Sequence, residues 1–164
     1  MDFSYIYNLL NSIAFIIGLW KIFEMRGEKG WKSLIPCYNQ YTLGAVSGDK
    51  NSGKKVAIMS GILLVLTIAM SIAMVPMMQA VQMYIATEGT ISPEAIRSII
   101  SESQLLLIGF IGIAMFVCAI IQIVFSIPLY KSVCKSFNRT EGWWVLLWIL
   151  VPGLAAILFA FQKK

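Results

Sequence analysis

Four long stretches of this 164-residue chain contain at most one charged side chain each. They cover residues 3–23, 56–86, 105–130 and 143–161. A helix that crosses a bilayer needs about 20 predominantly apolar residues, and each stretch approaches or exceeds that length. We therefore predict a single transmembrane domain over residues 1–164, which is an all-α, polytopic integral membrane protein with four transmembrane helices.

The composition argues against a soluble fold and against most enzyme classes. Hydrophobic residues make up 59% of the chain and charged residues 13%, whereas a soluble domain carries about 25% charged residues. The chain has no histidine, which removes the most common general base and a frequent metal ligand. We predict that the protein is not an enzyme and has no catalytic residue, cofactor or metal site. One alternative stays open, because four methionines at helical spacing suit either Cu(I) binding or packing: Met70, Met74, Met77 and Met78.

The basic residues of the loops predict the orientation of the chain. Residues 21–55 and 131–139 contain ten Lys and Arg, whereas the other side of the predicted membrane has three. Cytoplasmic loops carry the excess of Lys and Arg in membrane proteins. We therefore predict a multi-pass protein of the inner (cytoplasmic) membrane with its N-terminus outside. This distribution accounts for the net charge of +5, so we predict no nucleic-acid partner.

The loop after the first predicted helix contains an apolar, aromatic stretch over residues 31–46, WKSLIPCYNQYTLGAV. It is too short to span a bilayer and is interrupted by Pro36, so we predict an interfacial elbow on the cytoplasmic side. On the outer side, Ser92-Pro93-Glu94 is typical of a helix start and predicts an amphipathic helix over 93–101. The stretch 56–86 is roughly 46 Å long as a helix, which exceeds a hydrocarbon core of about 30 Å. We expect it to tilt, to kink at Pro76 or to project outward.

A short internal repeat relates the two inner loops. Lys21-x-Phe23, followed by Gly30-Trp31-x-x-Leu34, is echoed by Lys135-x-Phe137, followed by Gly142-Trp143-x-x-Leu146. Each set follows a helix that is predicted to run from outside to inside. We therefore predict two parallel hairpin repeats, related by an axis along the membrane normal.

The run from Gly27 to Tyr41, GEKGWKSLIPCYNQY, resembles the signature of a bacterial family of small multi-helix membrane proteins. That family carries a G-W-x-x-L-I-P-x-Y-N-x-Y elbow, and the second inner loop of this chain is similar to it as well. The resemblance implies a multi-helix topology and a bacterial cytoplasmic membrane. It brings a domain of unknown function, with no catalytic residue to carry over.

Three groups of residues are candidate sites. The elbow is predicted to dock or to anchor the protein through Trp31, Pro36, Tyr38, Asn39 and Tyr41. The segment Gly48–Lys55 nearly matches a phosphate-binding P-loop but lacks the required Ser or Thr at position 55, so anionic lipid headgroups are the predicted ligands of Lys50, Lys54 and Lys55. Polar residues at membrane depth are predicted either to line a path or to bond helices together: Asn8, Asn11, Gln79, Gln82 and Gln122.

These features favour a non-enzymatic membrane subunit or scaffold. It would act in the lipid bilayer through helix packing, with itself as a homo-oligomer or with another membrane protein. The alternative is a homo-oligomeric passive pore or a transporter of small solutes or ions, with the Asn and Gln side chains facing its path.

Overall fold

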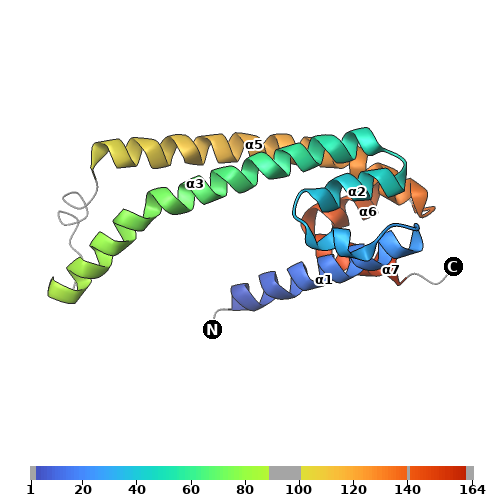
Figure 1. Cartoon of the computed structure of the whole chain (residues 1–164), viewed down its shortest axis with the longest axis horizontal. Coiled ribbons are helices and arrows are strands. Elements are labelled where there is room, and N and C mark those ends of the chain that lie inside the picture. Colours follow the sequence, from blue (N-terminus) through green and yellow to red (C-terminus); the bar gives the residue numbers. More distant parts are fainter. Residues whose placement is uncertain (1–2, 89–100, 140, 162–164) are drawn as a thin grey trace. The chain divides into compact units, whose positions relative to one another are not determined.

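The computed structural model describes residues 3–88, 101–139 and 141–161, and all regular structure within them is helical (Figure 1). The α-helical fold class is thus confirmed for the described residues. The predicted outer helix over 93–101 lies, apart from its last residue, outside them. The elements in chain order are α1 (Phe3–Met25), the 3-10 helix η1 (Gly30–Leu34), α2 (Tyr38–Ser47), α3 (Lys50–Glu88), α5 (Glu102–Ser136), α6 (Glu141–Leu150) and α7 (Pro152–Ala160).

Within the described residues, three helices are long and apolar enough to cross a membrane: Ser4–Met25, Lys50–Thr87 and Glu102–Ser136. The fourth predicted segment, 143–161, differs from the expected single helix because it is divided into α6 and α7. The break lies at Val151, whose φ of −139° and ψ of 71° are not helical. Pro152 explains it, because a proline disfavours helical geometry in the residue before it and itself suits the first position of a new helix.

Two compact units make up the chain. The first, called here the packed unit, consists of Met1–Gly61 and Ile121–Lys164. The second, called the helical-pair unit, is Ile62–Ile120 and contains the later part of α3 and the earlier part of α5. Each unit is described below by itself.

The packed unit has a core of buried side chains to which α1, α2, the start of α3, the end of α5, α6 and α7 all contribute. Trp148 is its largest member and is stacked on Tyr130, with ring centroids 5.3 Å apart. Phe159 meets Trp148 edge to face at 5.5 Å. Such aromatic pairs contribute roughly 0.5–1.5 kcal/mol each beyond the area that they bury. Aliphatic side chains complete the core: Leu19, Ile22, Leu43, Val56, Leu129 and Val133.

Helices α1 and α7 approach closely because glycine and alanine line their contact. A Cβ atom added at Gly18 would lie 2.5 Å from the carbonyl carbon of Ala156. One added at Gly153 would lie 2.3 Å from the backbone oxygen of Asn11. Small residues of this kind allow helix backbones to pack closely where apolar surroundings provide little other driving force.

Helices α1 and α5 end in the same hydrogen-bonded turn. At the end of α1, Gly27 has a φ of 78°, and the amide of Glu28 donates to the carbonyl of Phe23 at 2.8 Å. At the end of α5, Asn138 has a φ of 54°, and the amide of Arg139 donates to the Cys134 carbonyl at 2.9 Å. Both are Schellman-type stops, which require a left-handed residue and therefore favour Gly or Asn.

This shared stop is a structural counterpart of the predicted repeat, but it aligns the residues of the two halves differently from the sequence pattern. It places Phe23 opposite Cys134, whereas the sequence pattern paired Phe23 with Phe137. Beyond the stop the two halves diverge, because η1 and α2 follow α1, while α6 follows α5. Gly30 packs against the indole of Trp20, whereas Gly142 has nothing within 4 Å of an added Cβ. The two-repeat layout is therefore not confirmed.

The helical-pair unit buries very little of its apolar surface within the chain. Only 6% of the most apolar stretch of each long helix, α3 and α5, is buried. Leu106, Phe110 and Ile113 are among this unit's most exposed residues, with exposed fractions of 75%, 74% and 68%. Helix α3 continues as one helix past Pro76. Its 39 residues measure roughly 58 Å at 1.5 Å per residue, which is longer than predicted.

Candidate functional site

The elbow is folded as a 3-10 turn, a tight reversal and a helix. At the reversal, the amide of Tyr38 donates to the carbonyl of Pro36 at 2.7 Å, which closes a three-residue γ-turn. Its central residue, Cys37, has a φ of 66° and a ψ of −46°. This form of the γ-turn is rare and strained for a residue with a side chain. Sequence reasoning did not predict the strain, since Pro36 alone signals a break and not its geometry.

The turn between α2 and α3 accounts for the P-loop-like sequence. Gly48 has a φ of 89° and ends α2, with the amide of Asp49 donating to the carbonyl of Gly44 at 2.9 Å. The carboxylate of Asp49 accepts a hydrogen bond from the amide of Ser52 at 3.0 Å, and so caps the first turn of α3. Hydrogen bonds from the side chain and from the backbone amide of Ser52 lower the pKa of Asp49. The Gly and Asp of the motif therefore build a helix–turn–helix corner.

Glycines bring α2 against the first turns of α3. A Cβ at Gly44 would lie 2.6 Å from the Cα of Gly53, and one at Gly53 would lie 2.9 Å from the carbonyl oxygen of Gln40. Because the backbones lie this close, side chains on the adjacent faces of the two helices border the same space. The corner thus positions the elbow tyrosines near the lysines of α3.

That space is an open groove of about 1050 Å³. It brings together residues that the sequence placed in two separate candidate groups, namely the elbow and the basic segment. No carboxylate is among its lining residues, which are Pro36, Cys37, Tyr38, Tyr41, Lys50, Asn51, Lys54, Ala57 and Ile58. The groove is the candidate functional site.

Each of the two tyrosine rings that line the groove lies beside a lysine ammonium group, which comes from α3 for one ring and from η1, outside the groove lining, for the other. The rings of Tyr38 and Tyr41 are stacked, with centroids 5.7 Å apart. The Lys50 Nζ lies 5.6 Å from the centroid of Tyr41, and the Lys32 Nζ lies 5.8 Å from that of Tyr38. Both distances are within the range of cation–π attraction. The tyrosine pair therefore holds one lysine on each of its two rings.

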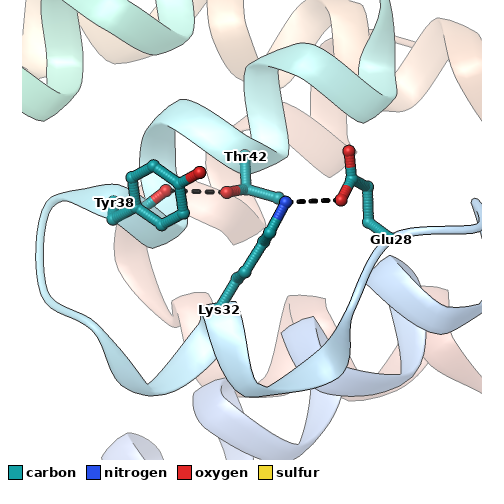
Figure 2. Close-up of polar contacts among 4 residues, drawn as sticks. All are labelled: Glu28, Lys32, Tyr38 and Thr42. Atoms are coloured by element: carbon teal, nitrogen blue, oxygen red, sulfur yellow. Dashed lines mark hydrogen bonds and ion pairs between the residues drawn. The ribbon is translucent and has the colours of Figure 1, made fainter.

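Lys32 and Lys50 differ in how their charge is balanced. Figure 2 shows Lys32 reaching Glu28, with Nζ 2.6 Å from Oε2, beside Tyr38. The hydrogen bond between them raises the pKa of Lys32 and lowers that of Glu28. Lys50 and Lys54 have no carboxylate partner within the part of the chain that the structure describes. The uncompensated positive charge of the groove thus comes from these two residues.

Other residues of the predicted sites lie outside the groove. Trp31 is half exposed and does not line it. The amide nitrogen of Asn39 donates to the backbone oxygen of Ser33 at 3.5 Å, which is a contact internal to the elbow. The Nζ of Lys55 lies over the ring of Phe125, 5.9 Å from its centroid. The structure therefore separates Lys55 from Lys50 and Lys54.

The predicted polar residues at membrane depth fall into two sets. The side-chain oxygen of Asn11 accepts from the amide of Gly153 at 3.1 Å, at the start of α7. Gln122 donates to the hydroxyl of Ser60 at 3.1 Å, linking α5 to α3 inside the packed unit. The remaining three, Asn8, Gln79 and Gln82, are exposed.

No protein-family model, curated protein or solved structure matches this chain. The resemblance of the elbow to a bacterial family therefore stays a prediction. Among the described residues, no cluster of three or more His, Cys, Asp or Glu could hold a metal ion. The groove is consequently interpreted from its own chemistry, which is cationic at one end and apolar at the other.

Proposed function

We propose that the chain is a non-enzymatic membrane subunit or scaffold that acts through its apolar helices. The observation that carries this proposal is the exposure of the apolar side chains of α3 and α5 in the helical-pair unit. Soluble monomers rarely expose contiguous apolar patches larger than a few hundred Å². Lipid tails, or helices of another protein or another copy, are the surroundings that such a surface favours.

The structure of the packed unit also supports this proposal. Its buried core, close glycine contacts and capped turns give this unit a defined structure of its own. We place the elbow and the other basic loops of this unit at the cytoplasmic face of a bacterial inner membrane, with the N-terminus outside, on the basis of their Lys and Arg residues. In this arrangement the elbow is the docking or anchoring element.

A catalytic role receives no support from the chemistry of the groove. Its polar side chains are lysine, tyrosine and asparagine, without a carboxylate or histidine that could exchange a proton near neutral pH. The arrangement can bind and orient an anion. The Cys37 thiol also lines the groove, but within the described part of the chain no base is hydrogen-bonded to it, as an activated nucleophile would require.

The deciding experiment is native mass spectrometry of the tagged full chain, extracted from its own membrane in mild detergent. A second protein in fixed stoichiometry, or a closed ring of identical chains, supports the subunit proposal. A lone monomer in every mild detergent tested argues against it. The Trp31→Ala/Tyr38→Ala variant tests the elbow, with Tyr5→Ala/Trp143→Ala, which alters two exposed aromatic residues elsewhere, as the matched control.

A pore or transporter is the second candidate, supported by the exposed amides of Asn8, Gln79 and Gln82. Asn11 and Gln122 support it less, because both already bond within the chain. Flux of a small solute or ion into liposomes tests this function. A flux that Gln79→Leu/Gln82→Leu abolishes supports the pore, and the absence of flux for wild-type protein excludes it.

A further inference from the structure

We propose that the groove between the elbow and α3 binds one anionic phospholipid of the adjacent leaflet. Lys50 and Lys54 face the phosphate of its headgroup, and the start of its acyl chain lies along Ala57 and Ile58. This inference rests on the proposed membrane setting of the elbow. It does not depend on whether the chain assembles with a partner.

The polarity of one face of α3 matches that of a lipid. Residues 50, 51, 54, 57 and 58 of this helix line the groove, and 50, 54, 57 and 58 follow the i, i+4, i+7, i+8 spacing of a single helical face that Asn51 borders. The lysines lie at the beginning of α3, and the apolar residues follow where the long apolar stretch begins. A headgroup and a chain laid along this face would each meet side chains of matching polarity.

The opposite wall of the groove has the residues that favour a bilayer interface. Tyr38 and Tyr41 combine an apolar ring with a phenolic hydroxyl, which is why tyrosine is enriched at headgroup level. Pro36 and Cys37 add an apolar edge, and the Sγ of Cys37 approaches α3 at Gly61, where an added Cβ would lie 3.9 Å away. The elbow thus follows α3 from its charged start toward its apolar stretch.

The charges around the groove favour an anion beside Lys50 and Lys54, and not beside the other nearby lysines. Lys32 is paired with Glu28, and Lys55 lies on another face, where its charge helps to lower the pKa of Asp49. Lys50 and Lys54 are left to balance a negative group from outside the chain. An anionic headgroup is the complementary partner within reach of a membrane surface.

The test uses the purified full chain in mild detergent, after removal of bound lipid. Native mass spectrometry measures the retention of added phosphatidylglycerol and of phosphatidylcholine with the same acyl chains. We expect one phosphatidylglycerol per chain and no comparable retention of phosphatidylcholine. The Lys50→Gln/Lys54→Gln variant should bind roughly thirtyfold more weakly, which is about a fivefold loss for each lysine. Lys50→Arg/Lys54→Arg should keep most of the binding, since it keeps both charges.

A matched control separates the groove from bulk charge. Lys21→Gln/Lys29→Gln removes the same charge from two exposed lysines outside the groove and should leave retention unchanged. Equal losses in the two Gln variants, or equal retention of the two lipids, would overturn the proposal.

A soluble competitor identifies the source of the phosphate. Glycerol phosphate at the concentration of the lipid should not displace it, because the apolar half of the groove adds to lipid binding. Ile58→Gln should in turn weaken phosphatidylglycerol binding. Displacement by glycerol phosphate would overturn the lipid assignment in favour of a soluble phosphate. The mass of the protein complex in the same spectra reports assembly independently, so loss of lipid and loss of a partner are read separately.

Discussion

Glycine has opposite roles in the packed unit and in the helical-pair unit. In the packed unit, a Cβ added at Gly44 or Gly153 would overlap neighbouring backbone at 2.3–2.7 Å. In the helical-pair unit, Gly109 has nothing within 4 Å, and Gly112 would reach only the end of the flexible Met70 side chain at 3.7 Å. The two units have similarly apolar helices, but only one uses its small residues for close contact. Apolar composition alone therefore does not tell a packed helix from an exposed one.

The largest expected effect comes from replacing one glycine of each unit by alanine. Gly153→Ala should lower the free energy of unfolding by about 3 kcal/mol, because the new Cβ overlaps the backbone of Asn11 and disturbs the bond at the start of α7. Gly109→Ala should be neutral or stabilise by up to about 1 kcal/mol, since alanine favours helix over glycine. Thermal unfolding in a fixed detergent measures both. Equal effects of the two substitutions would contradict the comparison.

The corner before α3 should make the packed unit sensitive to acid. Because the pKa of Asp49 is lowered from its ordinary 3.8, the folded chain holds this proton less tightly than the unfolded chain does. The stabilisation from the cap is complete above the unfolded value and is lost as the pH falls through the lower folded value. Asp49→Ala should remove about 1 kcal/mol at neutral pH, whereas Asp49→Asn should keep most of it.

Hydrogen exchange at individual amides checks this acid effect. Acid should increase exchange at the start of α3, and the Asn variant should lack that part of the pH response. Residues 62–87 contain no Asp, Glu, Lys or Arg and serve as the internal reference. An equal response of both regions would show that Asp49 is not its source.

A smaller effect should come from the backbone conformation of a glycine alone, without any steric overlap. Gly27 has open space around it, but its φ of 78° is unfavourable for alanine. Gly27→Ala should therefore destabilise by about 1 kcal/mol without any steric overlap. Asn138→Gly, at the equivalent stop of α5, should stabilise by a few tenths of a kcal/mol, because glycine adopts this conformation more readily. Thermal unfolding of both variants measures the pair, and destabilisation by both would contradict the shared motif.

The sequence predicts the apolar helices well because length and composition determine whether a helix can span a bilayer. The helical class, and three of the four predicted segments as long helices, could be obtained in this way. The break at Val151 was not predicted, although Pro152 is its signal, because the apolar run on both sides favours one continuous segment. The corner residues Gly48 and Asp49 belong to the near-match to a P-loop, which Lys55 excludes, and nothing in that spacing predicted a capped turn.

The groove could not be predicted from the sequence. Its tyrosines and lysines were singled out as separate groups, because their juxtaposition depends on contacts between helices. Gly44 and Gly53 bring α2 against α3, and no local pattern marks either glycine as a contact between helices. Lys50 and Lys55 are likewise indistinguishable as basic residues in one segment. Only the helical phase places Lys50 in the groove and Lys55 beside Phe125.

The smallest predicted destabilisation concerns glutamine in the two units. Gln122 bonds to Ser60 in the packed unit, whereas the side chain of Gln79 in the helical-pair unit is exposed. Interhelical hydrogen bonds in membrane proteins average about 0.6 kcal/mol, so Gln122→Leu should destabilise by that amount and Gln79→Leu should not. The Gln122→Leu/Ser60→Ala double variant, compared with each single change, isolates the pair. If Gln79→Leu proves the more costly change, Gln79 has a partner outside the chain, and the helical-pair unit is where that partner binds.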